Sequence, residues 1–96
     1  MMISKDNLAI RNAISDFDRR VEDFHVAIQK YYQGVEKRLP EWERLELELL
    51  QFSKKRIQDL ELARQLERVQ YKFQNRKQIW LRWIDEVHAN GWKKNP

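Results

Sequence analysis

Residues 10–35, IRNAISDFDRRVEDFHVAIQKYYQGV, carry the clearest helical pattern in the chain. Large apolar side chains recur from Ile10 to Val35 at alternating steps of four and three residues. This spacing is a heptad repeat, which keeps one apolar seam of a helix against one partner helix along its whole length. The pattern therefore predicts a long amphipathic helix over about residues 4–38, packed on its partner as in a coiled coil.

The residues that follow predict a sharp turn and a second helix. Residues 38–43 read RLPEWE, and proline is tolerated at the first helical position because its missing N–H would be unpaired there anyway. Glu41 and Glu43 place negative charge at the positive end of the new helix dipole. We therefore predict a turn over residues 38–41 and a second helix over about 41–74.

A connection this short makes the two helices antiparallel neighbours, so the sequence predicts a long helical hairpin. With the turn centred near Pro40, residue i lies opposite about residue 79 − i. Opposite charges then meet at most positions, for example Asp23 beside Arg56 and Lys30 beside Glu48. Each exposed pair contributes no more than about 1 kcal/mol, so the charges support this pairing more than they stabilise it.

The apolar stripe of the second helix changes phase across the polar run SKKR at residues 53–56. One straight helix cannot present both halves of the stripe to the same neighbour, so either the helix is overwound there or its halves have different partners. Residues 75–78, NRKQ, are typical of a capping box, so segment 75–90 either continues the second helix or folds back as a short third helix. We expect this segment to end at Gly91, followed by a loose basic tail over 91–96.

Composition places the chain among all-α proteins and limits its function. Its 96 residues suit one domain, and two glycines and two prolines supply too few turns for a β-sandwich or barrel. No apolar run approaches the roughly 18 residues of a membrane span, and the absence of cysteine fits a cytoplasmic protein. A hairpin of this size has little interior, so we expect residues 1–96 to form one helical domain that self-associates into a bundle, as a homodimer.

The predicted hairpin leaves apolar side chains near the C-terminus without a partner helix. Ile3, near the start of the first helix, pairs with about residue 76, so apolar side chains beyond residue 76 have no residue of the first helix opposite them. Burying each large apolar side chain is worth about 1.5 to 3 kcal/mol, so these side chains are expected to be covered. Three arrangements would cover these side chains: a folded-back third helix, a second copy of the chain, or another protein. We expect a protein partner, which would make the chain a non-catalytic adaptor, regulator, chaperone or assembly subunit. The predicted partner-binding residues are Ile79, Trp80, Trp83, Ile84, Val87 and Trp92.

The charge distribution suggests an alternative function, the binding of nucleic acid. Residues 1–48 carry eight basic and ten acidic side chains, whereas residues 49–96 carry eleven and five. Basic residues spaced by four form one ridge of a helix with about 6 Å between neighbours, which is comparable with phosphate spacing in RNA or DNA. Acidic residues of the first helix neutralise part of this charge. This favours the interpretation that the basic residues form a flank of the helix that faces solvent or a protein partner. The predicted ridge comprises Arg64, Arg68, Lys72 and Arg76, and with the adjacent Lys77 these are the predicted nucleic-acid-binding residues.

The sequence carries no enzyme motif. The three serines have no nucleophile signature, and neither glycine belongs to a phosphate-binding loop. His25 and His88 lie far apart, and neither has another His or a Cys at metal-binding spacing. Glu22 and His25 match the Glu-x-x-His spacing of two-iron bundles only once, and Glu22 is predicted to face away from the seam. We therefore expect no enzyme activity, no cofactor and no metal, and we interpret His25 as a structural residue beside the seam.

Overall fold

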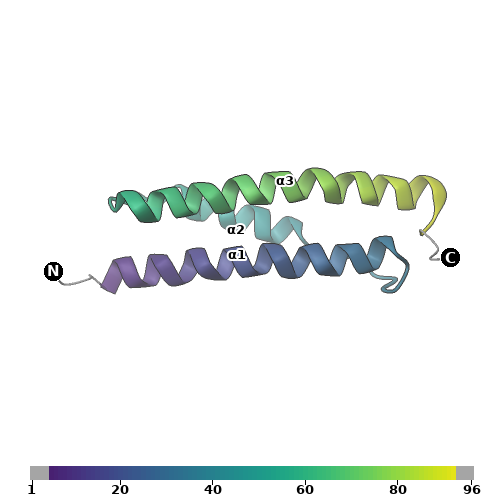
Figure 1. Cartoon of the computed structure of the whole chain (residues 1–96), viewed down its shortest axis with the longest axis horizontal. Helices are drawn as coiled ribbons and strands as arrows, with labels where there is room; N and C mark the ends of the chain where they lie inside the picture. The colour runs from purple at the N-terminus through teal and green to yellow at the C-terminus, as the bar shows by residue number, and fades with distance from the viewer. Residues whose placement is uncertain (1–4, 93–96) are drawn as a thin grey trace.

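The computed structural model describes residues 5–92, which form three helices. These are α1 (Lys5–Tyr32), α2 (Glu43–Ser53) and α3 (Leu60–Asn90). The long helices α1 and α3 lie side by side, and the short α2 packs along the pair in a rod about 57 Å long (Figure 1). The prediction of an all-helical fold is confirmed for this part of the chain. The predicted helix start at residue 4 and the tail beyond Trp92 lie outside the described residues.

α1 ends at Tyr32, whereas the heptad predicts a helix to residue 38. Gly34 adopts a φ of +77° and donates its N–H to the Tyr31 carbonyl, and the Val35 N–H bonds to the carbonyl five residues before it. This arrangement is a Schellman motif, in which a positive φ favours glycine because glycine has no Cβ. Val35 therefore lies outside the helix and is 62% exposed, although its spacing continues the heptad.

The second predicted helix, 41–74, is two helices separated by a loop. α2 ends at Ser53, and the chain reverses over residues 54–59 before α3 begins. The break coincides with the change of phase in the apolar stripe, so each half of the stripe faces the core from its own helix. The Asp59 carboxylate caps α3 by accepting a hydrogen bond from the Leu62 N–H at 3.0 Å.

Segment 75–90 continues the helix that precedes it and does not fold back as a separate third helix. α3 runs without interruption through residues 75–78 to Asn90, and Gly91 follows with a φ of +79°. The predicted helix end at Gly91 is confirmed, and the Gly91 N–H bonds to the Val87 carbonyl at 2.8 Å.

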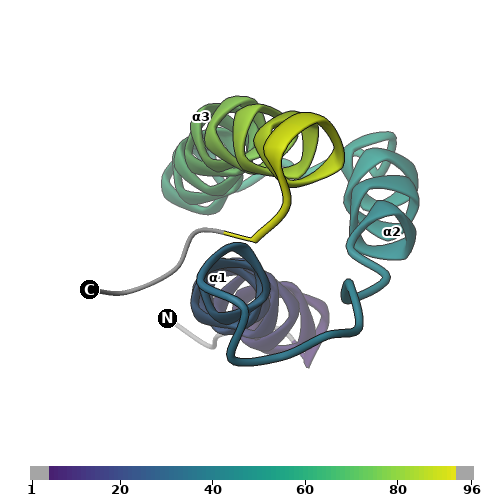
Figure 2. The ribbon, with the colours of Figure 1, turned by 90° about the vertical axis from the view of Figure 1, so that its right-hand side faces the viewer.

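The two chain reversals make α3 parallel to α1, so the predicted pairing of residue i with 79 − i is wrong. Side chains 54 residues apart in sequence meet instead: Lys72 meets Asp18 at 3.0 Å, and Arg76 meets Glu22 at 3.1 Å. Seen from one end, the three helices form a triangle (Figure 2). The core between them includes Ile14, Val21 and Ile28 from α1, Leu45 and Leu49 from α2, and Leu62, Leu66, Val69, Phe73, Trp80 and Ile84 from α3.

Candidate interaction surfaces

The predicted aromatic binding surface is largely part of the core. Trp80 is fully buried, and Ile84 and Val87 are only 9% and 8% exposed. The Trp80 ring packs on Phe73 and Trp42, with a centroid distance of 5.8 Å to each. The expectation that these side chains lack a cover within the chain is wrong, because the parallel α3 sets them against the second half of α1.

The two other tryptophans of the predicted surface also contact their own chain. Trp83 stacks on Tyr32 of α1 with ring centroids 5.2 Å apart. The ring of Trp92 meets Tyr31 edge-on, and the Lys37 ammonium lies 4.1 Å from the Trp92 centroid. Trp92 thereby packs over the end of α1, and a cation above an aromatic face is favourable.

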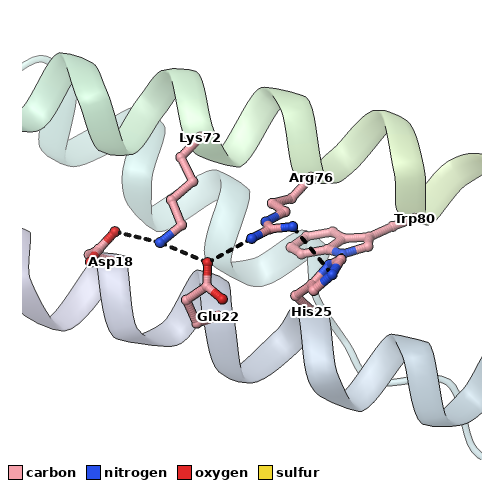
Figure 3. Close-up of polar contacts among 6 residues, drawn as sticks. All are labelled: Asp18, Glu22, His25, Lys72, Arg76 and Trp80. Carbon is pink, nitrogen blue, oxygen red and sulfur yellow. Dashed lines mark hydrogen bonds and ion pairs between the residues drawn. The ribbon is translucent and has the colours of Figure 1, made fainter.

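A polar cluster joins α1 to α3 beside the buried Trp80 (Figure 3). Lys72 donates to Asp18 at 3.0 Å and lies 2.7 Å from Glu22. Arg76 donates to the same Glu22 oxygen at 3.1 Å, so one carboxylate joins two cations. These side chains are partly exposed, so each ion pair contributes little free energy, and the cluster mainly favours one alignment of the two helices.

The cluster shifts the pKa values of its members. Hydrogen bonds, first from Lys72 and then from Arg76, hold the pKa of Glu22 below its ordinary value, although partial burial opposes them. Burial alone would lower the pKa of Lys72, but hydrogen bonds to Glu22 and Asp18 outweigh that effect and raise it. Glu22 and Lys72 therefore stay charged over a wider pH range than they would in the unfolded chain.

His25 accepts the hydrogen bond of the buried Trp80 indole. The indole nitrogen donates to His25 Nδ1 at 3.1 Å, and because Nδ1 accepts, the proton of a neutral His25 lies on Nε2. Arg76 Nη1 lies 3.3 Å from Nε2. A second proton, on Nδ1, would make both ring nitrogens donors, and each would then face another donor. Burial, followed by the charge of Arg76, lowers the pKa of His25. These contacts agree with a structural role for His25.

The predicted basic ridge is divided by contacts within the chain. Lys72 and Arg76 pair with acidic side chains of α1, and Lys77 lies 2.6 Å from Glu46 of α2. Three of the five predicted cations are therefore partly neutralised, which weakens the continuous ridge that the spacing predicts.

Two cations of the predicted ridge remain on the outer side of α3. Within the described part of the chain, Arg64 and Arg68 form no ion pair. They line a shallow groove together with Tyr71, which is 72% exposed, and with the partly buried Ile79. Glu67 and the ion-paired Lys72 and Arg76 line the same groove. The groove therefore offers, beside an exposed aromatic ring, two guanidinium groups that form no ion pair among residues 5–92.

An apolar pair on α2 was not among the predicted site residues. Leu47 and Leu50 are 61% and 54% exposed, and their spacing of three makes them neighbours on the outer face of the helix. The opposite face of α2 buries Leu45 and Leu49 in the core. Four leucines within six positions exceed what one helix face buries, and this excess is the signal by which the outer pair could have been found.

The same outer face carries one charge beyond each end of the leucine pair. Glu43 lies four residues before Leu47, and Lys54 lies four residues after Leu50. Both charged side chains are exposed, and neither forms an ion pair among residues 5–92. We call Glu43, Leu47, Leu50 and Lys54 the α2 stripe.

Neither metal ligation nor comparison with known proteins assigns a function. Among residues 5–92, no three His, Cys, Asp or Glu side chains gather closely enough to hold a metal ion. In the same part of the chain, no helix has the length and apolar character needed to cross a bilayer. No family model matches the chain, and neither does any curated protein or solved structure. Functional inference therefore depends on the surfaces described above.

We expect the free energy of unfolding to fall as the pH is lowered from about 7 to 5. The pKa of His25 is lower in the folded chain than its ordinary value of 6.5, so the unfolded chain binds more protons over this range. The lowered pKa of Glu22 adds a second decrease below pH 4.5. His25→Gln should flatten the first decrease, and urea titrations at several pH values measure it.

His88→Gln is the matched control for this experiment, because His88 is exposed at the end of α3. This variant should keep the wild-type pH profile. An unchanged slope between pH 7 and 5 in His25→Gln would contradict the role given to His25.

Proposed function

We propose that this protein is a non-catalytic interaction module that binds a protein partner through the outer face of α2. The observation that carries the proposal is the exposure of Leu47 and Leu50, at 61% and 54%, side by side on one short helix. Full burial of a leucine side chain is favourable by about 1.5 to 3 kcal/mol, so a partner that covers both gains appreciable free energy. The proposal keeps the protein partner and the cytoplasmic location expected from the sequence, and it moves the binding surface.

The rest of α2 supports this use of its outer face. The inner face, with Leu45 and Leu49, already packs in the core, so the outer leucines are not needed to hold α2 in place. Beside the outer leucines runs a shallow groove toward α3 that is also lined by Gln70 and Gln74. Their amide groups offer hydrogen bonds at the edge of an apolar contact, which is the usual arrangement of a protein interface.

The aromatic residues near the C-terminus are better explained by folding than by partner binding. A partner reaches the fully buried Trp80 only if α1 and α3 separate. Trp83 is already stacked on Tyr32. Substitution of either tryptophan is therefore expected to destabilise the chain, and a loss of binding in such a variant would not identify a surface.

Photo-crosslinking tests the proposed surface in the cells that produce the chain. With p-benzoylphenylalanine in place of Leu47, we expect irradiation to give a protein adduct at least fivefold more abundant than with the same group at Asn12. Asn12 is the matched control because it is also exposed but lies on α1. A further Leu50→Asp change should remove the adduct, since it places a charge in the apolar contact.

The adduct should be sensitive to protease and resistant to nuclease. Equal adduct yields at positions 47 and 12, or no adduct at position 47, would contradict binding through the outer face of α2.

A second candidate function is the binding of RNA or DNA at the groove on α3. The observation that favours it is the position of Arg64 and Arg68, which form no ion pair among residues 5–92, beside the 72% exposed Tyr71. The exposed run Lys54-Lys55-Arg56 lies in the loop that leads into the N-terminal end of α3. Arginine binds backbone phosphates and an exposed aromatic ring stacks on bases, so this surface suits a single-stranded nucleic acid.

Arg64→Gln/Arg68→Gln should weaken binding of single-stranded RNA at least tenfold at low salt and reduce the dependence of binding on salt. Gel retardation of a labelled oligonucleotide at several salt concentrations measures both effects. Arg82→Gln is the control, because Arg82 is an exposed arginine of α3 outside this groove. The absence of any retardation of wild type at low salt would exclude this candidate.

A further inference from the structure

We propose that the partner seated on the outer face of α2 is a second copy of this chain. The inference rests on the proposed function, because it uses the same surface. The α2 stripe runs Glu43, Leu47, Leu50, Lys54, with steps of four, three and four residues. These steps are the same when read from either end, and the two ends carry opposite charges. A surface with this order is complementary to itself in the antiparallel direction.

A two-fold axis makes use of this complementarity. When two α2 helices pack antiparallel across such an axis, residue n lies opposite about residue 97 − n. Leu47 then meets Leu50 of the second copy, and Glu43 meets Lys54 of the second copy. The symmetry repeats each contact, so the interface contains four leucines in its centre and two ion pairs at its ends.

The other charged residues of α2, Arg44, Glu46 and Glu48, lie outside the stripe. Glu46 and Glu48 lie on either side of the stripe, and each already pairs with a cation, one on α3 and one on α1. Glu43 and Lys54, by contrast, have no ion-pair partner among residues 5–92. Arg44 also forms no ion pair among these residues, but it lies outside the stripe. The two charges of the stripe itself are therefore the two that a second copy satisfies.

The size of the contact sets the strength of the dimer. α2 has 11 residues, so two such helices bury less than the roughly 1,600 Å² of a standard protein interface. We therefore expect a dimer that dissociates on dilution through the micromolar range. An unrelated partner has no need of a stripe that mirrors itself, which is why the charge order favours a second copy over another protein.

Light scattering of the full chain over a range of concentrations tests the proposal. We expect the absolute mass to rise from 11.9 kDa toward twice that value as the concentration increases. Glu43→Lys alone, or Lys54→Glu alone, places like charges opposite each other and should weaken dimerisation at least tenfold. An equimolar mixture of the two variants should dimerise at least as well as wild type, because every end contact then joins opposite charges.

Controls separate the contact from the stability of the helix. Glu61→Lys makes the same charge change in the first turn of α3, away from the stripe, and should leave dimerisation unchanged. Circular dichroism of every variant checks that helix content is kept, because both charge changes in α2 oppose its dipole. Leu47→Ala should also weaken dimerisation, whereas Leu60→Ala, at a 65% exposed leucine of α3, should not.

Two outcomes overturn the proposal. One is a mass that stays at 11.9 kDa up to millimolar concentration. The other is a dimer that forms equally well in wild type and in each charge variant alone, because it then uses another face. A monomeric chain that still forms the position-47 adduct with another protein would reject the second copy as partner and leave the proposed function intact. Loss of that adduct as well would reject both.

Discussion

The indole of Trp80 is the point at which three parts of the fold meet. It is fully buried, packs on Phe73 of its own helix and on Trp42 at the start of α2, and donates its N–H to His25 of α1. Loss of a buried tryptophan costs about 3–5 kcal/mol, whereas each partly exposed ion pair between α1 and α3 is worth about 1 kcal/mol or less. The burial of Trp80, more than the charge pattern, therefore sets α3 parallel to α1.

Local signals were sufficient to predict the helical class, the start of the second helix near Trp42 and the end of α3 at Gly91. They did not predict the reversal over residues 54–59, because this loop contains no glycine or proline and its lysine, arginine and glutamine residues all favour helix. The change of phase in the apolar stripe marked the position. Whether the chain reverses there or continues as one overwound helix depends on which arrangement buries both halves of the stripe. That burial is a property of the whole fold and not of the local sequence.

The candidate site was harder to predict because its location depends on the direction of α3. Opposite charges meet in both arrangements: an antiparallel hairpin sets Asp23 beside Arg56, and the structure sets Glu22 beside Lys72 and Arg76. Charge pairing therefore did not distinguish between them. The assumed direction assigned the surplus apolar surface to the C-terminal tryptophans, whereas the surplus that the structure leaves uncovered includes the outer leucines of α2.

A distance between two spin labels decides whether α1 and α3 are parallel. Gln29 and Asp85 are exposed positions on the two helices, and both lie close in sequence to the hydrogen bond that Tyr32 of α1 donates to Glu86 of α3. Because packed helix axes are about 8–10 Å apart, we expect the labels to lie within about 25 Å of each other. A straight antiparallel hairpin would set residue 29 opposite about residue 50, and the intervening helix would separate the labels by about 50 Å. The shorter distance supports the parallel pair, and the longer one would contradict it.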